Sequence, residues 1–309
     1  MKADMVIDQS TLRGTLHVNE PLSRHTSWRV GGVAARYYQP ADIEDLALFI
    51  GQLPEGEPVY WVGLGSNLLV RDGGFAGTVI CTSGVLNNIH YLQDDVVEVE
   101  AGVACPKVAR QTAKQGLQGA EFLSGIPGTM GGALAMNAGA FGGETWEIIQ
   151  SVKTVDQKGN LQERTPDDYK ISYRHVLGPE NEWFVSAKLK LQQGNSEQSL
   201  QKIKQLLAKR GSSQPTQQPN AGSVFKNPEG DYAARLIEEA GLKGCCIGGA
   251  CVSDKHANFI VNTGTATASD IESLINKVAN EVKLQHQVEL KTEVRIVGQA
   301  DTGQGGLNE

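Results

Sequence analysis

Apolar residues either alternate with polar ones or recur every three to four positions along most of the chain, which predicts a mixture of strands and helices. The alternation over residues 28–37 predicts a strand that a Gly-Gly turn interrupts. Asp42 is placed to cap the next helix, which Pro54 and Pro58 follow. The expected apolar stripe of this helix is Leu46, Phe49 and Ile50. We therefore expect a βαβ-like opening over residues 1–58.

The middle of the chain alternates short strand patterns with helical ones. Residues 59–62 and 183–191 read as strands, residues 106–115 read as a helix, and a Lys-Gly-Asn turn separates two strands after residue 149. We expect residues 59–195 to form one α+β domain. A polar link then leads into a helix with an apolar stripe of Leu200, Ile203, Leu206 and Leu207.

The last part of the chain predicts a separate α+β unit over residues 196–298, with a tail at 299–309. Residues 210–230 are rich in Pro, Gly and Gln and read as an exposed loop, and a helix over 231–240 follows. Ser269 and Glu272 have the spacing of a helix capping box. The pattern over 288–298 alternates cleanly and predicts a final strand, with Glu293 on its polar face. The expected fold class is α+β.

Composition narrows the range of functions. The 28 basic and 35 acidic residues give a net charge of −7, which argues against a general nucleic-acid binder. No apolar run is long enough to span a bilayer, and the N-terminus lacks the pattern of a signal peptide. We expect a cytoplasmic monomer that binds no membrane.

The five cysteines predict thiols rather than a disulfide framework, because their number is odd and no export signal accompanies them. Cys245, Cys246 and Cys251 lack the paired spacing of a zinc site, so we expect no metal and assign them a packing role.

A glycine-rich segment, residues 124–144, carries the first functional signal. Seven of its 21 residues are glycine and none is Lys or Arg, so its backbone can approach a bulky ligand and offer N–H groups. Tight turns and the packing of small residues explain such a composition equally well.

A second glycine-rich loop, residues 63–77, follows a strand and favours the ligand-binding interpretation. Its glycines allow close backbone approach, while Ser66 and Asn67 supply polar groups for a diphosphate. The third glycine of a dinucleotide fingerprint would fall on Leu68, and no triphosphate-binding loop is present. An ordinary hairpin turn remains the alternative for this loop.

Six motifs together carry a resemblance to a known family. In order they are GLGSNLLVRDGGFAG, SGIPGTMGGALAMNAGAFGGE, ISYR, NAGSVFKNP, KHANFIVN and TEVRIVG, and the match that includes them runs from about residue 25 to residue 298. They resemble the UDP-N-acetylenolpyruvoylglucosamine reductase (MurB) family, in its compact type without a tyrosine loop. The resemblance implies an FAD-binding domain of the vanillyl-alcohol-oxidase (PCMH) type and a separate substrate domain. It also implies NADPH-dependent reduction of UDP-N-acetylglucosamine enolpyruvate to UDP-N-acetylmuramate in peptidoglycan synthesis, hence roles in cell wall biogenesis, cell shape and cell division.

The resemblance also implies roles for individual residues. Ser223 matches the proton donor, Glu293 a catalytic carboxyl group and Arg174 a catalytic arginine. The implied FAD contacts are Gly63, Gly65, Ser66, Asn67, Leu68, Gly125, Ile126, Pro127, Gly128, Thr129, Gly131, Gly132, Ala133, Asn137, Gly139 and Ala140. The implied substrate contacts are Tyr173, Arg210, Lys226 and Asn227. Two features depart from the family pattern: Val176 stands where a serine is frequent, and no lysine stands near Gln214.

These residue types suit the implied chemistry. Reduction of an enol ether places negative charge on the neighbouring carboxylate, which a guanidinium such as Arg174 can stabilise. Glu293 can assist if it is protonated, so we expect its pKa to be raised. Ser223 needs a relay partner to deliver a proton at neutral pH.

Two other functions fit the same features. One is a flavin oxidase of the same cofactor fold that acts on an alcohol or sugar. The other is a nucleotide- or flavin-binding protein without turnover, for which Ser223→Ala would change no rate.

Overall fold

The structure is a computed structural model that describes residues 7–301; most of the expected C-terminal tail lies outside the described residues. The chain forms two compact units. The first unit contains the residues up to His17, then Arg36–Gly63 and Gly77–Lys209. The second contains Val18–Ala35, Leu64–Ala76 and the residues from Arg210 onwards. The loop with Ser66 and Asn67 therefore clusters with the C-terminal residues.

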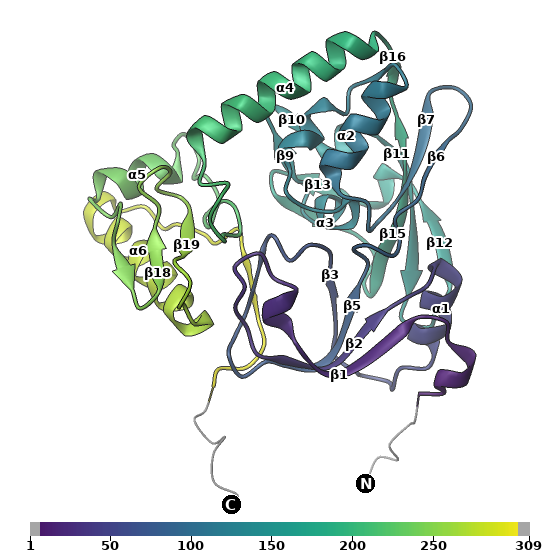
Figure 1. The fold of residues 1–309 in the computed structure, drawn as a ribbon, viewed down its shortest axis with the longest axis horizontal. Helices are drawn as coiled ribbons and strands as arrows, with labels where there is room; N and C mark the ends of the chain where they lie inside the picture. The colour runs from purple at the N-terminus through teal and green to yellow at the C-terminus, as the bar shows by residue number, and fades with distance from the viewer. Residues whose placement is uncertain (1–6, 302–309) are drawn as a thin grey trace, which may run out of the picture. The chain divides into compact units, whose positions relative to one another are not determined.

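An antiparallel sheet of five strands organises the first unit (Figure 1). Its strand order is β12-β11-β15-β7-β6, with β6 at Ile89–Tyr91, β7 at Val96–Glu100, β11 at Ile149–Asp156, β12 at Leu161–Arg164 and β15 at Glu182–Lys190. Two helices, α2 (Cys105–Lys114) and α3 (Met130–Ala135), contribute buried side chains to the same apolar core as this sheet. The predicted helix at 106–115 and the paired strands after residue 149 are confirmed.

A second sheet has the strand order β1-β2-β5-β3. Its strands are β1 (Thr15–Pro21), β2 (Val33–Gln39), β5 (Phe75–Cys81) and β3 (Val59–Val62). Helix α1 (Ile43–Gly51) begins where the Asp42 carboxylate accepts a hydrogen bond from the Asp45 N–H at 2.9 Å. Leu46, Phe49 and Ile50 are buried, so the predicted cap and stripe are confirmed. The strand, in contrast, begins only at Val33, after the Gly-Gly turn.

The remaining elements of the first unit are short. The two-residue strands are β8 (Leu117–Gln118), β9 (Gly139–Ala140), β10 (Gly143–Glu144) and β16 (Gln192–Gln193), and a hairpin is formed by β13 (Lys170–Ser172) and β14 (His175–Leu177). The exception is helix α4 (Ser196–Ser213), which has 18 residues. Its residues up to Lys209 belong to this unit, and those from Arg210 belong to the second.

In the second unit, helix α6 (Ala268–His286) contacts the small antiparallel sheet β17-β18-β19 (Figure 1). The strands are β17 (Cys246–Ile247), β18 (Ala250–Val252) and β19 (Ile260–Asn262), and α5 (Ala233–Glu239) also contacts α6. Strand β4 (Leu68–Val70) pairs in parallel with β20 (Arg295–Val297). The apolar stripe of α6, which includes Ile271 and Leu274, is buried in the core.

Two expectations about this unit are wrong in detail. The capping box of α6 is formed by Thr267 and Asp270 rather than by Ser269 and Glu272, because the Glu272 carboxylate binds Arg71 instead. The final strand covers only Arg295–Val297. Before it, the backbone bonds to two different segments in turn, through Val224 and Asn67, so no continuous ladder forms.

The cysteine prediction is wrong for one pair: Cys246 and Cys251 form a disulfide, while Cys81, Cys105 and Cys245 are thiols. A two-residue turn brings the pair opposite each other on adjacent strands, a proximity that counting cysteines cannot reveal. Among residues 7–301, no group of three His, Cys, Asp or Glu side chains could hold a metal ion. None of the helices described is long and apolar enough to span a membrane.

Candidate active site

The glycine-rich segment of the first unit folds into a 3₁₀ turn, the short helix α3 and the β9–β10 hairpin. The hydroxyl groups of Ser124 and Thr129 are buried, and within the described part of the chain neither has a hydrogen-bond partner. A Cβ atom on Gly63 would lie 2.3 Å from the Thr129 hydroxyl oxygen. Buried polar atoms are nearly always bonded, so these two hydroxyls fit a bound polar group.

Arg174 lies at this segment. It occupies the turn of the β13–β14 hairpin with a φ of 52°, and its guanidinium donates to the carbonyl oxygens of Asn137 at 3.4 Å and Gly139 at 3.0 Å. The Arg174 Cζ atom also lies 4.9 Å from the ring centroid of Tyr173, which is 46% exposed. The structure thus brings the predicted catalytic arginine and one predicted substrate residue to the predicted FAD contacts Asn137 and Gly139.

Asn137 has a structural task as well. It is buried with a φ of 45°, and its side-chain amide donates to Glu144 at 2.7 Å, while its amide oxygen accepts from the Trp146 N–H at 3.1 Å. These bonds join the end of α3 to the hairpin that follows. Asn137 therefore shapes the glycine-rich segment from within.

A cavity of about 400 Å³ in the first unit lies beside this segment but is lined by none of the predicted FAD contacts. Its lining includes Glu121, Phe122, Phe141 and Lys202. Ser199 and Lys202 bind the Glu121 carboxylate at 2.9 and 3.5 Å. These contacts hold helix α4 against the 3₁₀ turn. We therefore interpret the cavity as a gap between packed elements and not as the ligand site.

In the second unit, the predicted diphosphate loop is fixed by its backbone. Gly65 has a φ of +60°, and a Cβ atom there would lie 2.0 Å from the His25 carbonyl oxygen, so no other residue fits without a backbone shift. The Gly65 carbonyl accepts from the Ser27 N–H at 3.1 Å. Leu68 is buried within β4, so its side chain packs in the unit.

The same loop joins the segment that carries Glu293. The Asn67 side-chain amide donates to the Glu293 carbonyl oxygen at 3.1 Å, and the Asn67 carbonyl accepts from the Arg295 N–H at 3.0 Å. Asn67 and Glu293 are 226 positions apart in sequence. Ser66, next to Asn67, is half-buried in the turn that precedes β4.

The segment that carries Ser223 is hydrogen-bonded to the segment that carries Glu293. The Glu293 N–H donates to the Val224 carbonyl oxygen at 2.8 Å, and the Lys226 N–H donates to the Lys291 carbonyl oxygen at 2.9 Å. Both Ser223 and Glu293 are half-buried. The structure therefore places two of the three predicted catalytic residues on adjacent extended segments, beside the predicted diphosphate loop.

Asn258 holds the Ser223 loop in place, and sequence reasoning did not single it out. Its side-chain oxygen accepts from the Phe225 N–H at 2.9 Å, and its side-chain amide donates to the Phe225 carbonyl at 2.8 Å. Its own carbonyl accepts from the Val224 N–H at 2.9 Å. Asn258 is 4% exposed, so a buried amide fixes the backbone two residues from Ser223. The only available signal was an asparagine before a short apolar strand.

The other predicted substrate residues lie on the second unit. Burial lowers the pKa of Arg210, whose Nε donates to the Gln214 side chain at 3.0 Å. Asn227 is exposed, and its side-chain oxygen accepts from the Ala233 N–H at 3.1 Å at the start of α5. Asn227 therefore caps this helix, whatever else it binds.

Comparisons with known proteins identify similar sequences and a similar fold. Residues 34–164 match the model of an FAD binding domain, and residues 214–297 match that of the UDP-N-acetylenolpyruvoylglucosamine reductase C-terminal domain. The chain is 57% identical over 290 residues to a UDP-N-acetylenolpyruvoylglucosamine reductase of Legionella pneumophila (strain Lens), covering 94% of each chain. It is 54% identical over 298 residues to one from Alkalilimnicola ehrlichii, covering 96% of this chain and all of the relative. The solved structure of UDP-N-acetylenolpyruvylglucosamine reductase (MurB) from Thermus caldophilus is similar with a TM-score of 0.79 and 32% identity, over 92% of this chain and 99% of that one.

Proposed function

The chain belongs to the UDP-N-acetylenolpyruvoylglucosamine reductase family, and from this premise we propose that it reduces UDP-N-acetylglucosamine enolpyruvate to UDP-N-acetylmuramate with NADPH, as an FAD-dependent oxidoreductase. The observation that carries the proposal is the 57% identity to a relative of this name over 94% of both chains. We extend the proposal to a role in peptidoglycan synthesis, and so in cell wall biogenesis, cell shape and division, by a cytoplasmic monomer.

The residues present fit FAD. The buried hydroxyls of Ser124 and Thr129, which have no hydrogen-bond partner among the described residues, are available to polar groups of the cofactor. Ser66 and Asn67 would bind the diphosphate. When bound, FAD supplies the transfer of two electrons from NADPH to the enol ether. The protein's own contribution is to bind, orient and protonate the substrate.

Arg174 orients and stabilises the substrate carboxylate in this proposal. Its guanidinium already binds two backbone carbonyls of the glycine-rich segment, which fix its position. A planar guanidinium can hold a carboxylate with two parallel hydrogen bonds, and these strengthen as negative charge develops. Tyr173, stacked beside it, would add an apolar contact to the bound substrate.

Ser223 delivers the proton in this proposal, and Glu293 assists. The backbone bond between Val224 and Glu293 holds their two segments together, so the hydroxyl and the carboxyl group can address one substrate carbon and its carboxylate. A protonated Glu293 can donate to the developing charge, whereas an ionised one would oppose it. Arg210, Lys226 and Asn227 would contact the diphosphate and sugar.

Spectroscopy of the purified protein tests the proposal. The protein should be yellow, anaerobic NADPH should bleach the flavin absorption, and the enolpyruvyl sugar nucleotide should restore it with formation of UDP-N-acetylmuramate. A colourless protein that takes up no FAD would overturn the proposal. Rapid recovery of colour in oxygen but not with the sugar nucleotide would point to the flavin oxidase instead.

A further inference from the structure

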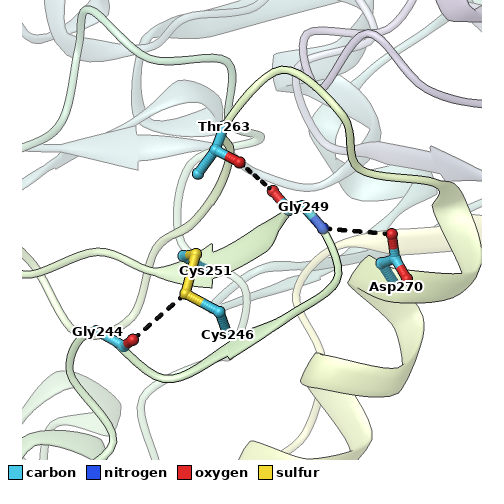
Figure 2. Close-up of a disulfide and its surroundings, with 6 residues drawn as sticks. All are labelled: Gly244, Cys246, Gly249, Cys251, Thr263 and Asp270. Carbon is cyan, nitrogen blue, oxygen red and sulfur yellow. Dashed lines mark hydrogen bonds between the residues drawn. A yellow bond between two sulfur atoms is a disulfide. The ribbon is translucent and has the colours of Figure 1, made fainter.

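Figure 2 shows the Cys246–Cys251 disulfide across the β17–β18 hairpin of the second unit. Residues alternate between the two faces of a strand, and here Cys245 and Ile247 pack against the apolar core. Cys246 lies between them and is exposed, while its partner Cys251 lies between the buried Ala250 and Val252 and is half-buried. The disulfide therefore occupies the outer face of this sheet, where solutes can reach it.

The hairpin accommodates the pair without a long loop. Ile247 pairs with Ala250, so only Gly248 and Gly249 form the turn, and the Cα atoms of Cys246 and Cys251 are 4.1 Å apart. The turn is anchored independently of the sulfurs, because the Gly249 carbonyl accepts from the Thr263 hydroxyl and N–H, both at 2.9 Å (Figure 2). Two thiols would thus remain neighbours after reduction.

In the reduced form, the Cys246 thiol also has a hydrogen-bond acceptor nearby. The Cys246 sulfur lies 3.3 Å from the Gly244 carbonyl oxygen (Figure 2). A sulfur in a disulfide carries no hydrogen, but a Cys246 thiol could donate to this oxygen. The same backbone arrangement therefore suits the disulfide and the dithiol.

We propose that Cys246 and Cys251 form a reversible thiol–disulfide exchange site whose reaction partner is a thiol, either of low molecular weight or of a dithiol protein. The incoming thiolate attacks the exposed Cys246 sulfur, which forms a mixed disulfide and releases Cys251 as a thiolate that takes up a proton. A second thiolate attacks the sulfur of the bound thiol and releases Cys246. The two thiols are oxidised to one disulfide, and the protein disulfide is reduced to two thiols.

The site is connected to the loop of the proposed proton donor, and this consequence rests on the proposed function. Cys246 pairs with Cys251, Cys251 pairs with Val261, and Val261 forms a bridge with Asn220, three residues before Ser223. The four residues form one row across adjacent segments. We infer that the disulfide, by clamping the hairpin, restrains residues 219–227 more strongly than the dithiol does.

The other cysteines do not take part. Cys81 and Cys105 are buried, and burial raises the pKa of both thiols, to about 12 for Cys105. Both therefore remain poor nucleophiles. Cys245 directly precedes β17 and packs against the core. They serve as internal controls.

Mass spectrometry of the whole protein tests the exchange. Trypsin releases residues 244–255 as one peptide that contains Cys245, Cys246 and Cys251. The protein is equilibrated anaerobically in buffers of reduced and oxidised glutathione, quenched in acid, denatured and alkylated. A peptide with one alkyl label contains the disulfide, because only Cys245 is free. A peptide with three labels contains the dithiol, and a peptide with two labels and one glutathione contains the mixed disulfide. We expect the peptide to move from one label to three as reduced glutathione rises, and back again.

Two further experiments identify the thiol that reacts with the protein and the protein sulfur that it attacks. Thioredoxin in place of glutathione distinguishes a dithiol protein from a small thiol as the efficient reductant. Cys251→Ser should accumulate glutathione on Cys246, while the control Cys245→Ser should cycle between no label and two. One label under every buffer and with thioredoxin, or three labels in oxidised glutathione alone, would overturn the proposal.

Hydrogen exchange tests the connection to the loop without measuring activity. Backbone amides in residues 219–227 should exchange severalfold faster in the reduced protein and in Cys251→Ser than in the disulfide form. Amides of α2 in the first unit should not change. Equal exchange in both redox forms would refute the connection, whether or not the protein reduces the sugar nucleotide.

Discussion

The glycine-rich segment of the first unit and the Ser223–Glu293 group of the second unit are built in opposite ways. The first is one continuous stretch whose own turns, short helix and hairpin create the surface. The second is assembled from the 63–77 loop, the Ser223 loop and the segment before β20, which are joined by a few backbone hydrogen bonds and by the Asn67 side chain. A continuous segment can tolerate local adjustment, whereas an assembled group depends on each connection. The predictions below test this difference.

Ser223→Ala should have the largest effect. A positioned general acid contributes about 10²–10⁴-fold to a rate, so reoxidation of the reduced flavin by the enolpyruvyl substrate should slow by about this factor. Reduction of the flavin by NADPH should stay nearly unchanged, because no proton from Ser223 is needed there. Anaerobic stopped-flow absorption separates the two half-reactions. Ser269→Ala, at an exposed serine of the same unit, is the matched control. Equal slowing of both half-reactions would contradict the proposed role.

Glu293→Gln should reduce the same half-reaction by about 10²-fold, as expected when one group that stabilises developing charge is replaced. If Glu293 acts in its protonated form, the wild-type rate should be present below the pKa of this carboxyl and fall as pH rises through it. The glutamine variant cannot ionise, so it should lose that alkaline decline. A pH profile of the half-reaction in both proteins decides the point. An unchanged decline in the variant would assign the titration to another group.

Asn258→Ala tests the assembled group without touching a catalytic side chain. The substitution leaves the N–H and carbonyl of Phe225 without their buried partner, which costs about 1–3 kcal/mol for each unsatisfied group. Unfolding in urea should show this loss of stability. Asn258→Asp keeps the acceptor for the Phe225 N–H but places a buried carboxylate oxygen against the Phe225 carbonyl, so its loss should be at least as large. A fall in the substrate half-reaction that exceeds the fall in flavin reduction would identify Asn258 as a positioning residue. An equal fall in both would leave it a structural role alone.

Glycine substitutions sharpen the comparison directly. Gly65→Ala forces a Cβ atom to 2.0 Å from the His25 backbone, in a positive-φ conformation, and should destabilise the protein by about 1–3 kcal/mol and weaken FAD binding. A Cβ atom at Gly125 would lie 2.4 Å from the Phe141 ring and 2.9 Å from the Ala140 Cβ atom. The ring can rotate away and only Ala140 must shift, so the loss should be smaller than for Gly65→Ala. Thermal unfolding and FAD titration measure both.

Gly211→Ala is the control for these substitutions. Apart from its chain neighbours and its own helix backbone, no atom of the described residues lies within 4 Å of its added Cβ. The residue is helical, so alanine should stabilise the protein by about 0.5–1 kcal/mol. If Gly125→Ala lost more stability than Gly65→Ala, the glycine-rich segment would be the region that tolerates substitution less well.

The contrast between the two regions also explains what the sequence could predict. Helix α1, its Asp42 cap and its buried stripe follow from short-range patterns, and the structure has them where expected. The final strand was predicted too long, because alternation reports which side chains face the core but not which segments supply partners. The proximity of Asn67 to Glu293, and of Asn258 to Phe225, depends on contacts between distant segments. Only the family resemblance indicated Ser223 and Glu293, and it included Asn258 in the motif KHANFIVN without a role.

The smallest effects should be changes in the free energy of unfolding with pH, and these changes should differ between the two units. In the second unit, burial lowers the pKa of His256, whose Nδ1 has no hydrogen-bond partner among the described residues. As pH falls, the unfolded chain therefore binds a proton at His256 more readily than the folded chain does. The contribution of neutral His256 to folding stability is fully present above a pH of about 6.5 and declines as pH falls below it. In the first unit, burial opposes ionisation of Glu121, but hydrogen bonds from its own N–H, Ser199 and Gly119 lower its pKa overall. Its contribution is present above the ordinary value of 4.5 and is lost below it.

Fluorine NMR of 5-fluorotryptophan resolves the two units during urea unfolding, because Trp28 belongs to the second unit and Trp61, Trp146 and Trp183 to the first. Between pH 7 and pH 5.5 the urea midpoint reported by Trp28 should fall more than the midpoint reported by the other three. His256→Phe should abolish that selective fall, since the variant has no imidazole to protonate. Glu121→Gln should instead reduce the loss of the first unit near pH 4. A common midpoint at every pH would mean that the two units unfold as one cooperative body, and that the independence of the continuous and the assembled region does not extend to their stability.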